Sequence, residues 1–216
     1  LNNIKNGPNI FLANEFFDAL PIKQFIKKKN TWYEKKVKIN KSNNFQIFEK
    51  KTNIKKLEKK IGYKISENQN FLEISEIALK FLKIISNKIN KYNGGLLIID
   101  YGYTNEKIKN TLRGIKSHKI VNFLSHYQEC DNTYSLAFNF IKKFAKQLKL
   151  KTSAIVTQRN FLINLGILQR AEMATKNLTF LKKSNIYYRI NKLINKNYMG
   201  EIFKVMFLTK NNTKFN

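Results

Sequence analysis

Acidic residues, cysteine, proline and glycine are all scarce in this sequence. Fourteen Asp and Glu face 41 Lys and Arg in 216 residues, which gives a formal net charge of +27. The single cysteine, Cys130, excludes an intramolecular disulfide and gives no sign of an oxidising compartment. Two prolines and eight glycines argue against a fibrous or disordered chain. The 43% of hydrophobic residues is ordinary for a globular domain, and the length allows a sizeable core.

Long apolar runs, metal-ligand clusters and leader segments are also missing. No apolar run approaches the length of a transmembrane helix, and no signal peptide begins the chain. His118 and His126 with one cysteine do not match the spacing of a zinc site, so we expect neither a metal nor a membrane span. The first residue is Leu1 rather than Met and lies close to a predicted strand, which we interpret as a truncation.

The positive charge raises the possibility of a nucleic-acid or anionic-membrane partner. Lysine is nevertheless dispersed through nearly every segment, beside abundant Asn, as in compositional drift of an AT-rich genome. We interpret the densest basic run as a solvated hairpin; it comprises Lys27–Lys29, followed by Lys35, Lys36 and Lys38. We therefore do not expect nucleic acid as the partner, and a basic nucleic-acid-binding protein is the lesser alternative.

Two segments have the pattern of buried parallel strands. Residues Asn9–Phe17 and Leu96–Gly102 are nearly continuous in apolar residues and end in polar ones. Apolar residues at three- and four-residue intervals predict a helix over Glu73–Tyr92, directly before the second strand. Helix followed by buried strand indicates an α/β fold with a parallel sheet. Glu201–Thr209 predicts a final strand, antiparallel and at the edge of that sheet.

The remaining segments are less regular. Loose alternation over Ile22–Phe48, punctuated by Lys-Asn and Ser-Asn turns, predicts antiparallel strands, and we assign residues 22–60 to a β-rich insertion on the main sheet. Residues 104–129 are mixed, and we expect a long functional loop or a short helix with loops. Ser135–Leu148 resumes a helical pattern.

The most specific motif is NEFFDALP over residues 14–21, followed by Gln24 and Phe25. It resembles the signature of the MidA-like S-adenosylmethionine-dependent methyltransferases. Further matches to that family follow in order along essentially the whole chain: Gly95–Tyr103, Thr111–Gly114, His118 with Lys119, Asp131, Thr133, Thr157 with Gln158, Leu165–Ile167, Met199 with Gly200, and Phe203–Val205.

The resemblance implies a fold, an activity and a partner. It makes residues 1–216 the carboxy-terminal half of a Rossmann-like class I methyltransferase sheet, without the amino-terminal half that holds most of the cofactor. Mitochondrial members are complex I assembly factors that dimethylate an arginine of a complex I subunit. It therefore implies S-adenosylmethionine as cofactor, an arginine-containing protein substrate, and a location in the bacterial cytoplasm or, in a eukaryote, the mitochondrial matrix.

The sequence departs from the family at two places. Ser135 stands where the family usually has His, and Ala137 where it has Asp, which puts any role of that pair in doubt. The Gly-rich turn after the family's first strand and the acidic residue after its second are both absent from this chain.

Glu15 and Asp18 are the candidate catalytic residues, with Asn14 lining the same site. Methyl transfer requires the protein to orient the nucleophile against the sulfonium-bound methyl. Carboxylates can grip a planar guanidinium through paired hydrogen bonds, and ligands gather at the carboxyl ends of strands in open α/β sheets. The alternative is a strand-end cap, with Asp18 as the N-cap of a helix.

Further candidates lie on the second strand and the loop after it. We expect Asp100, Tyr101 and Gly102, together with Asn14, to bind the cofactor, with Gly102 allowing close backbone approach. The alternative there is a plain strand terminus and turn. Three residues are expected at the substrate, although the two loop residues could equally be loop anchors: Phe17, Arg113 and His118.

Two functions therefore compete. The first is a protein-arginine methyltransferase that supports assembly of respiratory complex I. The second is a non-catalytic assembly or protein-binding module of the same fold, which gains weight from the missing cofactor-holding residues. Fold alone does not decide between them.

Overall fold

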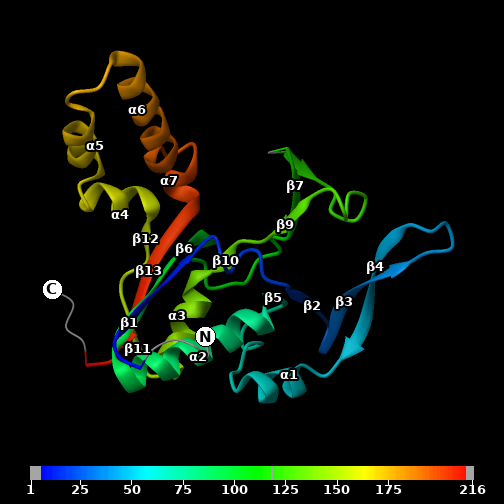
Figure 1. Ribbon diagram of the computed structural model, residues 1–216. Helices are drawn as coiled ribbons and strands as arrows, with labels where there is room; N and C mark the ends of the chain where they lie inside the picture. Colours follow the sequence, from blue (N-terminus) through cyan, green and yellow to red (C-terminus); the bar gives the residue numbers. More distant parts are fainter. Residues whose placement is uncertain (1–5, 118, 213–216) are drawn as a thin grey trace.

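The computed structural model describes residues 6–117 and 119–212 and has a mixed α/β fold (Figure 1). The main sheet is ordered β1-β6-β13-β11, and the short strands β10 and β12 pair with β6 and β13. β1 and β6 are parallel, whereas β13 is antiparallel to β6. The strands are β1 (Asn9–Asn14), β6 (Gly94–Tyr103), β10 (Leu136–Ala137), β11 (Leu150–Thr152), β12 (Val156–Thr157) and β13 (Phe203–Lys210).

Two helices, α2 (Glu76–Tyr92) and α3 (Phe138–Gln147), cover one face of this sheet. α2 begins where Ser75 accepts a hydrogen bond from the Ala78 N–H (3.1 Å), so the expected helix starts three residues later than its apolar pattern suggests. The strand side chains that pack into this core are at most 1% exposed: Leu96, Ile98, Met206 and Leu208.

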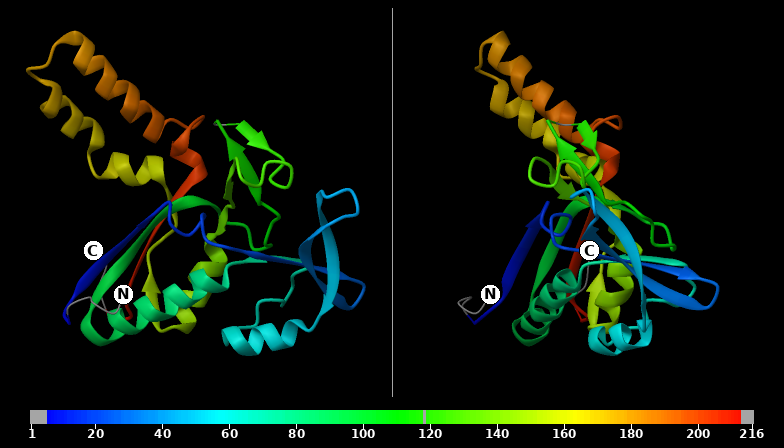
Figure 2. Two further views of the ribbon diagram at one scale, coloured as in Figure 1. Left: turned by 45° about the vertical axis from the view of Figure 1, so that its right-hand side comes forward. Right: turned by 90° about the vertical axis from the view of Figure 1, so that its right-hand side faces the viewer.

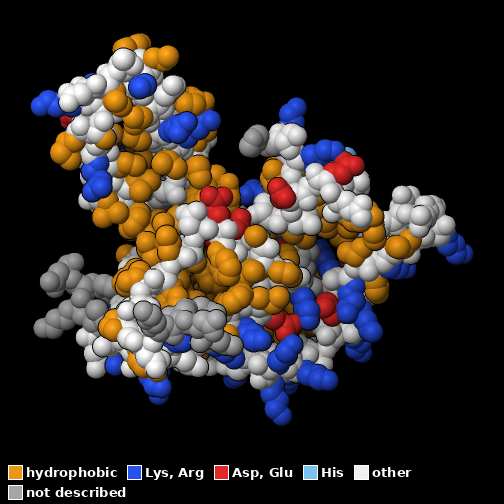
Figure 3. Space-filling model, in the orientation of Figure 1, with side chains coloured by type: hydrophobic (Ala, Val, Ile, Leu, Met, Phe, Trp, Pro, Cys, Tyr) orange, Lys and Arg blue, Asp and Glu red, His pale blue; other side chains and the backbone are white. Residues whose placement is uncertain are grey.

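The opposite face of the sheet is covered unevenly. Phe203 and Val205 of β13 are buried beside α4 and α7, but Ile10 and Leu12 of β1 are 68% and 67% exposed. The expectation that β1 is buried is therefore wrong for these two residues, because within the described chain their side of the strand has no cover. Figure 3 shows hydrophobic side chains gathered over this part of the sheet.

The final strand is antiparallel as expected, but its predicted place at the edge is wrong. β13 pairs with β6 on one side and with β11 and β12 on the other, so β11 occupies the edge. The physical reason is that β13 has apolar side chains on both faces, which need an interior position, whereas β11 is three residues long.

A second, antiparallel sheet has the order β4-β3-β2-β5 and lies beside the main sheet (Figures 1 and 2). Its strands are β2 (Lys23–Lys28), β3 (Thr31–Ile39), β4 (Phe45–Thr52) and β5 (Phe71–Ile74), with α1 (Ile54–Ile61) between the last two. Phe25 and Trp32 anchor it in the core at 3% and 7% exposure. The outer end of the β3–β4 hairpin projects from the body.

Residues expected to be irregular form a third sheet with the order β8-β7-β9. Its strands are β7 (Arg113–Lys116), β8 (Lys119–Val121) and β9 (Asp131–Thr133). These strands are three or four residues long and partly polar, so they carry too little periodicity to be recognised from sequence. We refer to them as the β7–β9 sheet.

Four helices precede β13 and include an arm that extends away from the body (Figure 2). They are α4 (Gln158–Asn164), α5 (Ile167–Thr175), α6 (Phe180–Ile194) and α7 (Met199–Ile202). Among the described residues, no helix combines the length and apolarity needed to cross a bilayer.

Gly102 lies where β6 meets β10 and α3, and a side chain there should destabilise the fold. A Cβ at this position would lie 2.4 Å from Phe138 ring atoms and 2.8 Å from the Leu136 carbonyl oxygen. Gly102→Ala should therefore lower the free energy of unfolding by about 1–3 kcal/mol, measured by denaturant titration. Adding Phe138→Leu should cost less in the Gly102→Ala background than in the wild type. Wild-type stability of Gly102→Ala would contradict this packing.

Candidate active site at the carboxyl ends of β1 and β6

The carboxyl ends of β1 and β6 lie side by side because the two strands are parallel, with Asn14 opposite Ile99. The chain then turns sharply: Glu15 adopts a left-handed backbone conformation with a φ of 46°. Its N–H donates to the Ile99 carbonyl oxygen (3.0 Å). A non-glycine residue in this region is uncommon, and such outliers cluster at functional sites.

Asp100 fastens the turn that follows β1. Its Oδ2 accepts hydrogen bonds from the N–H groups of Phe17 (3.0 Å) and Asp18 (3.4 Å). Its Oδ1 accepts from the N–H of Tyr101 (2.9 Å), and the side chain is completely buried. Asp100 therefore holds the backbone of the turn and presents no surface to a cofactor, so the expected direct contact is corrected to a positioning role.

Phe17 is 1% exposed and belongs to the core, so its expected place at the substrate is wrong. The neighbouring Phe16 is 38% exposed and packs edge-to-face against Phe17 and Phe81, with ring centroids 5.2 and 5.3 Å away. Phe17 is buried because its side chain packs in the same apolar core cluster as Ala13 of β1, and Asp100 holds its N–H.

Asp18 is 7% exposed and reaches the β7–β9 sheet. Its Oδ2 accepts a hydrogen bond from the Thr133 hydroxyl (2.8 Å), and its carbonyl oxygen accepts from the Tyr134 N–H (3.3 Å). Its Oδ1 is buried and has no hydrogen-bond partner among the described residues. A buried carboxylate oxygen without a partner is costly, so this atom is available to a donor from a ligand.

The other predicted residues are divided between the surface and the core. Asn14 and Glu15 are exposed at the strand end. Arg113 is half-buried, with its guanidinium carbon 5.5 Å from the Tyr101 ring centroid, and its Nε has no hydrogen-bond partner among the described residues. The site thus brings together Glu15, Asp18, Asp100, Tyr101 and Arg113, whereas His118 lies outside the described residues.

Gly102 was expected to let a ligand approach the backbone closely, but the protein itself occupies one side of this residue. The space into which a Cβ would project is filled by Phe138 and by the Leu136 carbonyl group, so glycine here permits close packing of the protein itself.

The environment of the site shifts the pKa of Asp100. Burial, and after it the charge of the nearby Asp18 carboxylate, raise the pKa of the Asp100 carboxyl to about 7, while the N–H groups of the turn oppose the shift. Burial also raises the pKa of the Tyr101 phenol above its ordinary value, as does the charge of Glu15, while Arg113 lowers it. Figure 3 shows acidic side chains at the junction between the base of the arm and the β7–β9 sheet.

Sequence reasoning missed a third buried acid, Glu73 of β5, which is 6% exposed. Its Oε2 accepts from Gln24 Nε2 (2.7 Å) and from the Leu112 N–H (3.2 Å), and its Oε1 accepts from the Thr111 N–H (3.1 Å). Gln24 and Thr111 lie in the family motifs, so they were a usable signal, whereas Glu73 stands alone in an apolar strand. These contacts tie the second sheet to the loop that leads into β7.

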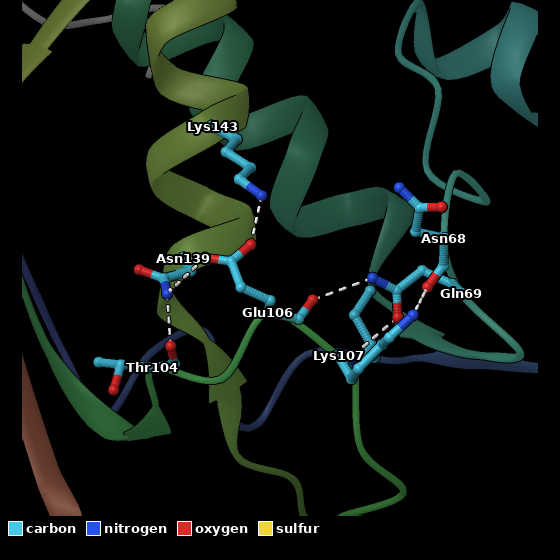
Figure 4. Close-up of polar contacts among 8 residues, drawn as sticks. Asn68, Gln69, Thr104, Glu106, Lys107, Asn139 and Lys143 are labelled. Atoms are coloured by element: carbon cyan, nitrogen blue, oxygen red, sulfur yellow. Dashed lines mark hydrogen bonds and ion pairs between the residues drawn. The ribbon is translucent and has the colours of Figure 1, made fainter.

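The β6–β7 loop is held from two sides by the polar contacts in Figure 4. The Glu106 carboxylate pairs with Lys143 of α3 and accepts a hydrogen bond from Asn139 (3.0 Å). Gln69 donates to the Glu106 carbonyl oxygen (2.9 Å) and accepts from the Ile108 N–H (2.9 Å). The loop that carries Arg113 therefore has a defined path. The described residues contain no group of three or more His, Cys, Asp or Glu arranged to hold a metal.

Comparisons with known proteins give the context for this geometry. Residues 1–156 match a family model described as "Putative S-adenosyl-L-methionine-dependent methyltransferase". The chain is 30% identical over 204 residues to "Protein arginine methyltransferase NDUFAF7, mitochondrial" of Danio rerio, covering 94% of this chain and 48% of the relative. For the Homo sapiens protein of the same name, identity is 28% over 216 residues, covering 96% and 47%.

A solved structure of a Burkholderia thailandensis protein bound to S-adenosyl-homocysteine has the same fold. It matches with a TM-score of 0.78 at 20% identity, covering 99% of this chain and 57% of the other. The chain thus spans about half the length of the curated relatives it matches.

The coupling between Asp18 and Asp100 predicts a pH-dependent stability. The pKa of folded Asp100, about 7, exceeds its ordinary value of 3.8, so its contribution to stability is present below about pH 4 and is lost as pH rises through about 7. Asp18→Asn removes one cause of the shift, so the free energy of unfolding should fall less steeply between about pH 4 and 7. Denaturant titrations across this range measure it.

Asp131→Asn, which neutralises an exposed acid on β9, is the matched control and should leave the wild-type slope unchanged. Equal slopes for wild type and Asp18→Asn would show that the two carboxyl groups are not coupled.

Proposed function

The chain belongs to the MidA-like family of S-adenosylmethionine-dependent methyltransferases, and on that premise we propose that it is part of an enzyme that methylates arginine side chains of a protein substrate. The observation that carries this proposal is the position of Glu15 and Asp18 at the carboxyl end of β1. Glu15 is exposed, and Asp18 has a buried oxygen with no hydrogen-bond partner in the part of the chain that the structure describes. The relatives named as protein arginine methyltransferases support the choice of substrate class.

The chain is, in this proposal, the carboxy-terminal half of a Rossmann-like class I methyltransferase sheet. Two parallel strands followed by an antiparallel strand fit that half. The exposed side chains of Ile10 and Leu12 on β1 leave an apolar surface that further helices of such a domain would cover. Residues 1–216 would form the partial catalytic domain. The separate antiparallel sheet supports the assignment of residues 22–60 as an insertion within it.

The cofactor would sit at the carboxyl edge of β1 and β6, where ligands bind in open α/β sheets. When bound, S-adenosylmethionine supplies an electrophilic methyl group on a cationic sulfonium. The chemistry of the residues present fits such a cation: Asn14 offers an exposed amide oxygen and the half-buried Tyr101 a phenol oxygen. Asp100 contributes through the turn that it holds, and Gly102 through the backbone next to Tyr101.

The residues of this chain orient the substrate and bias its charge. A guanidinium held by Glu15 and Asp18 would keep its positive charge directed towards the two carboxylates, leaving the third nitrogen to react. The formal net charge of +27 does not prevent a cationic side chain from binding here. Salt screens the field of surface charges beyond about 8 Å at physiological ionic strength, whereas the two carboxylates act at contact distance.

The proposal extends to the biological role that the family resemblance implies. Support of respiratory complex I assembly, through an arginine of one of its subunits, is our expectation for this chain. The relatives are named as mitochondrial, so the site of action would be the mitochondrial matrix in a eukaryote or the cytoplasm in a bacterium.

A non-catalytic binding module of the same fold is the second candidate. It is favoured by the complete burial of Asp100 and by the packing of Gly102 against Phe138, because both residues were expected at the cofactor. Cofactor binding separates the two candidates, since a module would bind none.

The acidic pair should be needed for methylation and not for cofactor binding. In the protein as its gene encodes it, Glu15→Gln should lower kcat/KM for arginine methylation by roughly 10- to 100-fold, the value of one hydrogen bond to a charged group. The dissociation constant for S-adenosyl-homocysteine, measured by calorimetry, should change by less than about threefold. Transfer of labelled methyl groups to protein arginine measures the rate.

Glu49→Gln, which neutralises a hairpin acid paired with Lys28, is the matched control and should leave both quantities unchanged. Absence of S-adenosyl-homocysteine binding in the wild-type protein would refute the enzyme and favour the module.

A further inference from the structure

A cavity opens beside the turn after β1, between parts of the chain that are distant in sequence. Its volume is about 480 Å³. Most of its wall comes from the turn itself, the β3–β4 hairpin and the β8–β9 connection, and residues next to β7 and β9 complete it. The described residues that line it are Asp18–Ile22, Val37, Phe45, Leu112, Phe123, Leu124, Tyr127, Asn132 and Tyr134.

The cavity has an exposed mouth and a buried floor. Val37 and Tyr127 are 51% and 53% exposed, whereas Asp18 and Tyr134 are 7% and 6% exposed. Phe45 of the hairpin and Tyr127 of the β8–β9 connection contact each other edge-to-face, with ring centroids 4.5 Å apart. The second sheet and the β7–β9 sheet therefore meet across this cavity.

The floor of the cavity carries a carboxylate, and no cationic side chain among its described lining residues balances the charge. Among the described residues that line the cavity, Asp18 is the one Asp or Glu, and there is no Lys or Arg. One Asp18 oxygen is bonded to the Thr133 hydroxyl, and the other is buried without a partner. A carboxylate at the end of an apolar passage is complementary to a cation on an aliphatic stem.

Resting on the function proposed above, we propose that this cavity receives the arginine side chain of the substrate protein. Its methylene groups would pack between the β3–β4 hairpin and the β8–β9 connection. Its guanidinium would donate a hydrogen bond to Asp18 Oδ1, at the strand end where the methyl group is delivered. The hairpin and the β7–β9 sheet are then the substrate-recognition elements of the enzyme.

Binding of two small molecules to the protein as its gene encodes it tests this assignment. Acetyl-arginine amide and acetyl-citrulline amide have nearly the same shape, but only the first is charged. NMR titration should give a preference for the arginine compound of roughly tenfold or more, the value of a charge-assisted hydrogen bond. Asp18→Asn should abolish the preference, because the amide keeps the shape of the side chain and removes its charge.

Wall variants test the passage separately. Leu124→Lys places a cation inside the cavity and Val37→Trp fills its half-exposed mouth, and each should weaken arginine-amide binding by about fivefold or more. The second variant changes a 51% exposed residue, so its folding is less at risk. Ile120→Lys is the matched control: Ile120 is 70% exposed on the same small sheet, outside the cavity lining, and the change should have no effect.

A preference that survives Asp18→Asn, or wall variants that bind like Ile120→Lys, would overturn the cavity assignment. S-adenosyl-homocysteine binding by the same samples is scored independently. Loss of the arginine preference with intact S-adenosyl-homocysteine binding supports the cavity assignment. Failure of the wild type to bind S-adenosyl-homocysteine counts against the proposed function, while the two amides still decide the cavity.

Discussion

The turn after β1 depends on one buried side chain of the neighbouring strand. Asp100 of β6 accepts hydrogen bonds from the N–H groups of Phe17 and Asp18, which lie more than eighty residues earlier in the chain. This contact is possible because β1 and β6 are parallel and in register, so that both carboxyl ends reach the same edge. It fixes the backbone of Asp18, and with it the direction of the carboxylate that we assign to the substrate.

Placing acids together in a buried turn is electrostatically unfavourable, and the arrangement persists because other contacts hold it. The Asp18 carboxylate and burial both raise the pKa of Asp100, while three N–H groups stabilise its charged form. The Arg113 guanidinium lies 5.5 Å from the centre of the Tyr101 ring and supplies positive charge beside this cluster. Proteins tolerate such local costs at functional sites, which is consistent with a site that awaits a cationic ligand.

Much of the fold was predictable because its signals are local. The existence of strands β1 and β6 and the periodicity of α2 were predicted correctly, and the NEFFDALP motif identified the family. The errors arose where tertiary contacts decide. The interior place of β13 depends on a partner more than fifty residues away, and the burial of Phe17 depends on the core cluster in which it packs. Glu73 and the cavity walls come from separate sheets, which spacing in sequence does not bring together.

One claim is therefore central: the turn that Asp100 holds presents the Asp18 carboxylate to a substrate guanidinium. A crystal structure of the protein as its gene encodes it, with S-adenosyl-homocysteine and acetyl-arginine amide, tests this most directly. The account predicts a guanidinium nitrogen within hydrogen-bond distance of Asp18 Oδ1, with Asp100 still bonded to the N–H groups of the turn. A guanidinium bound elsewhere, with the cavity beside Asp18 empty of it, would contradict the account.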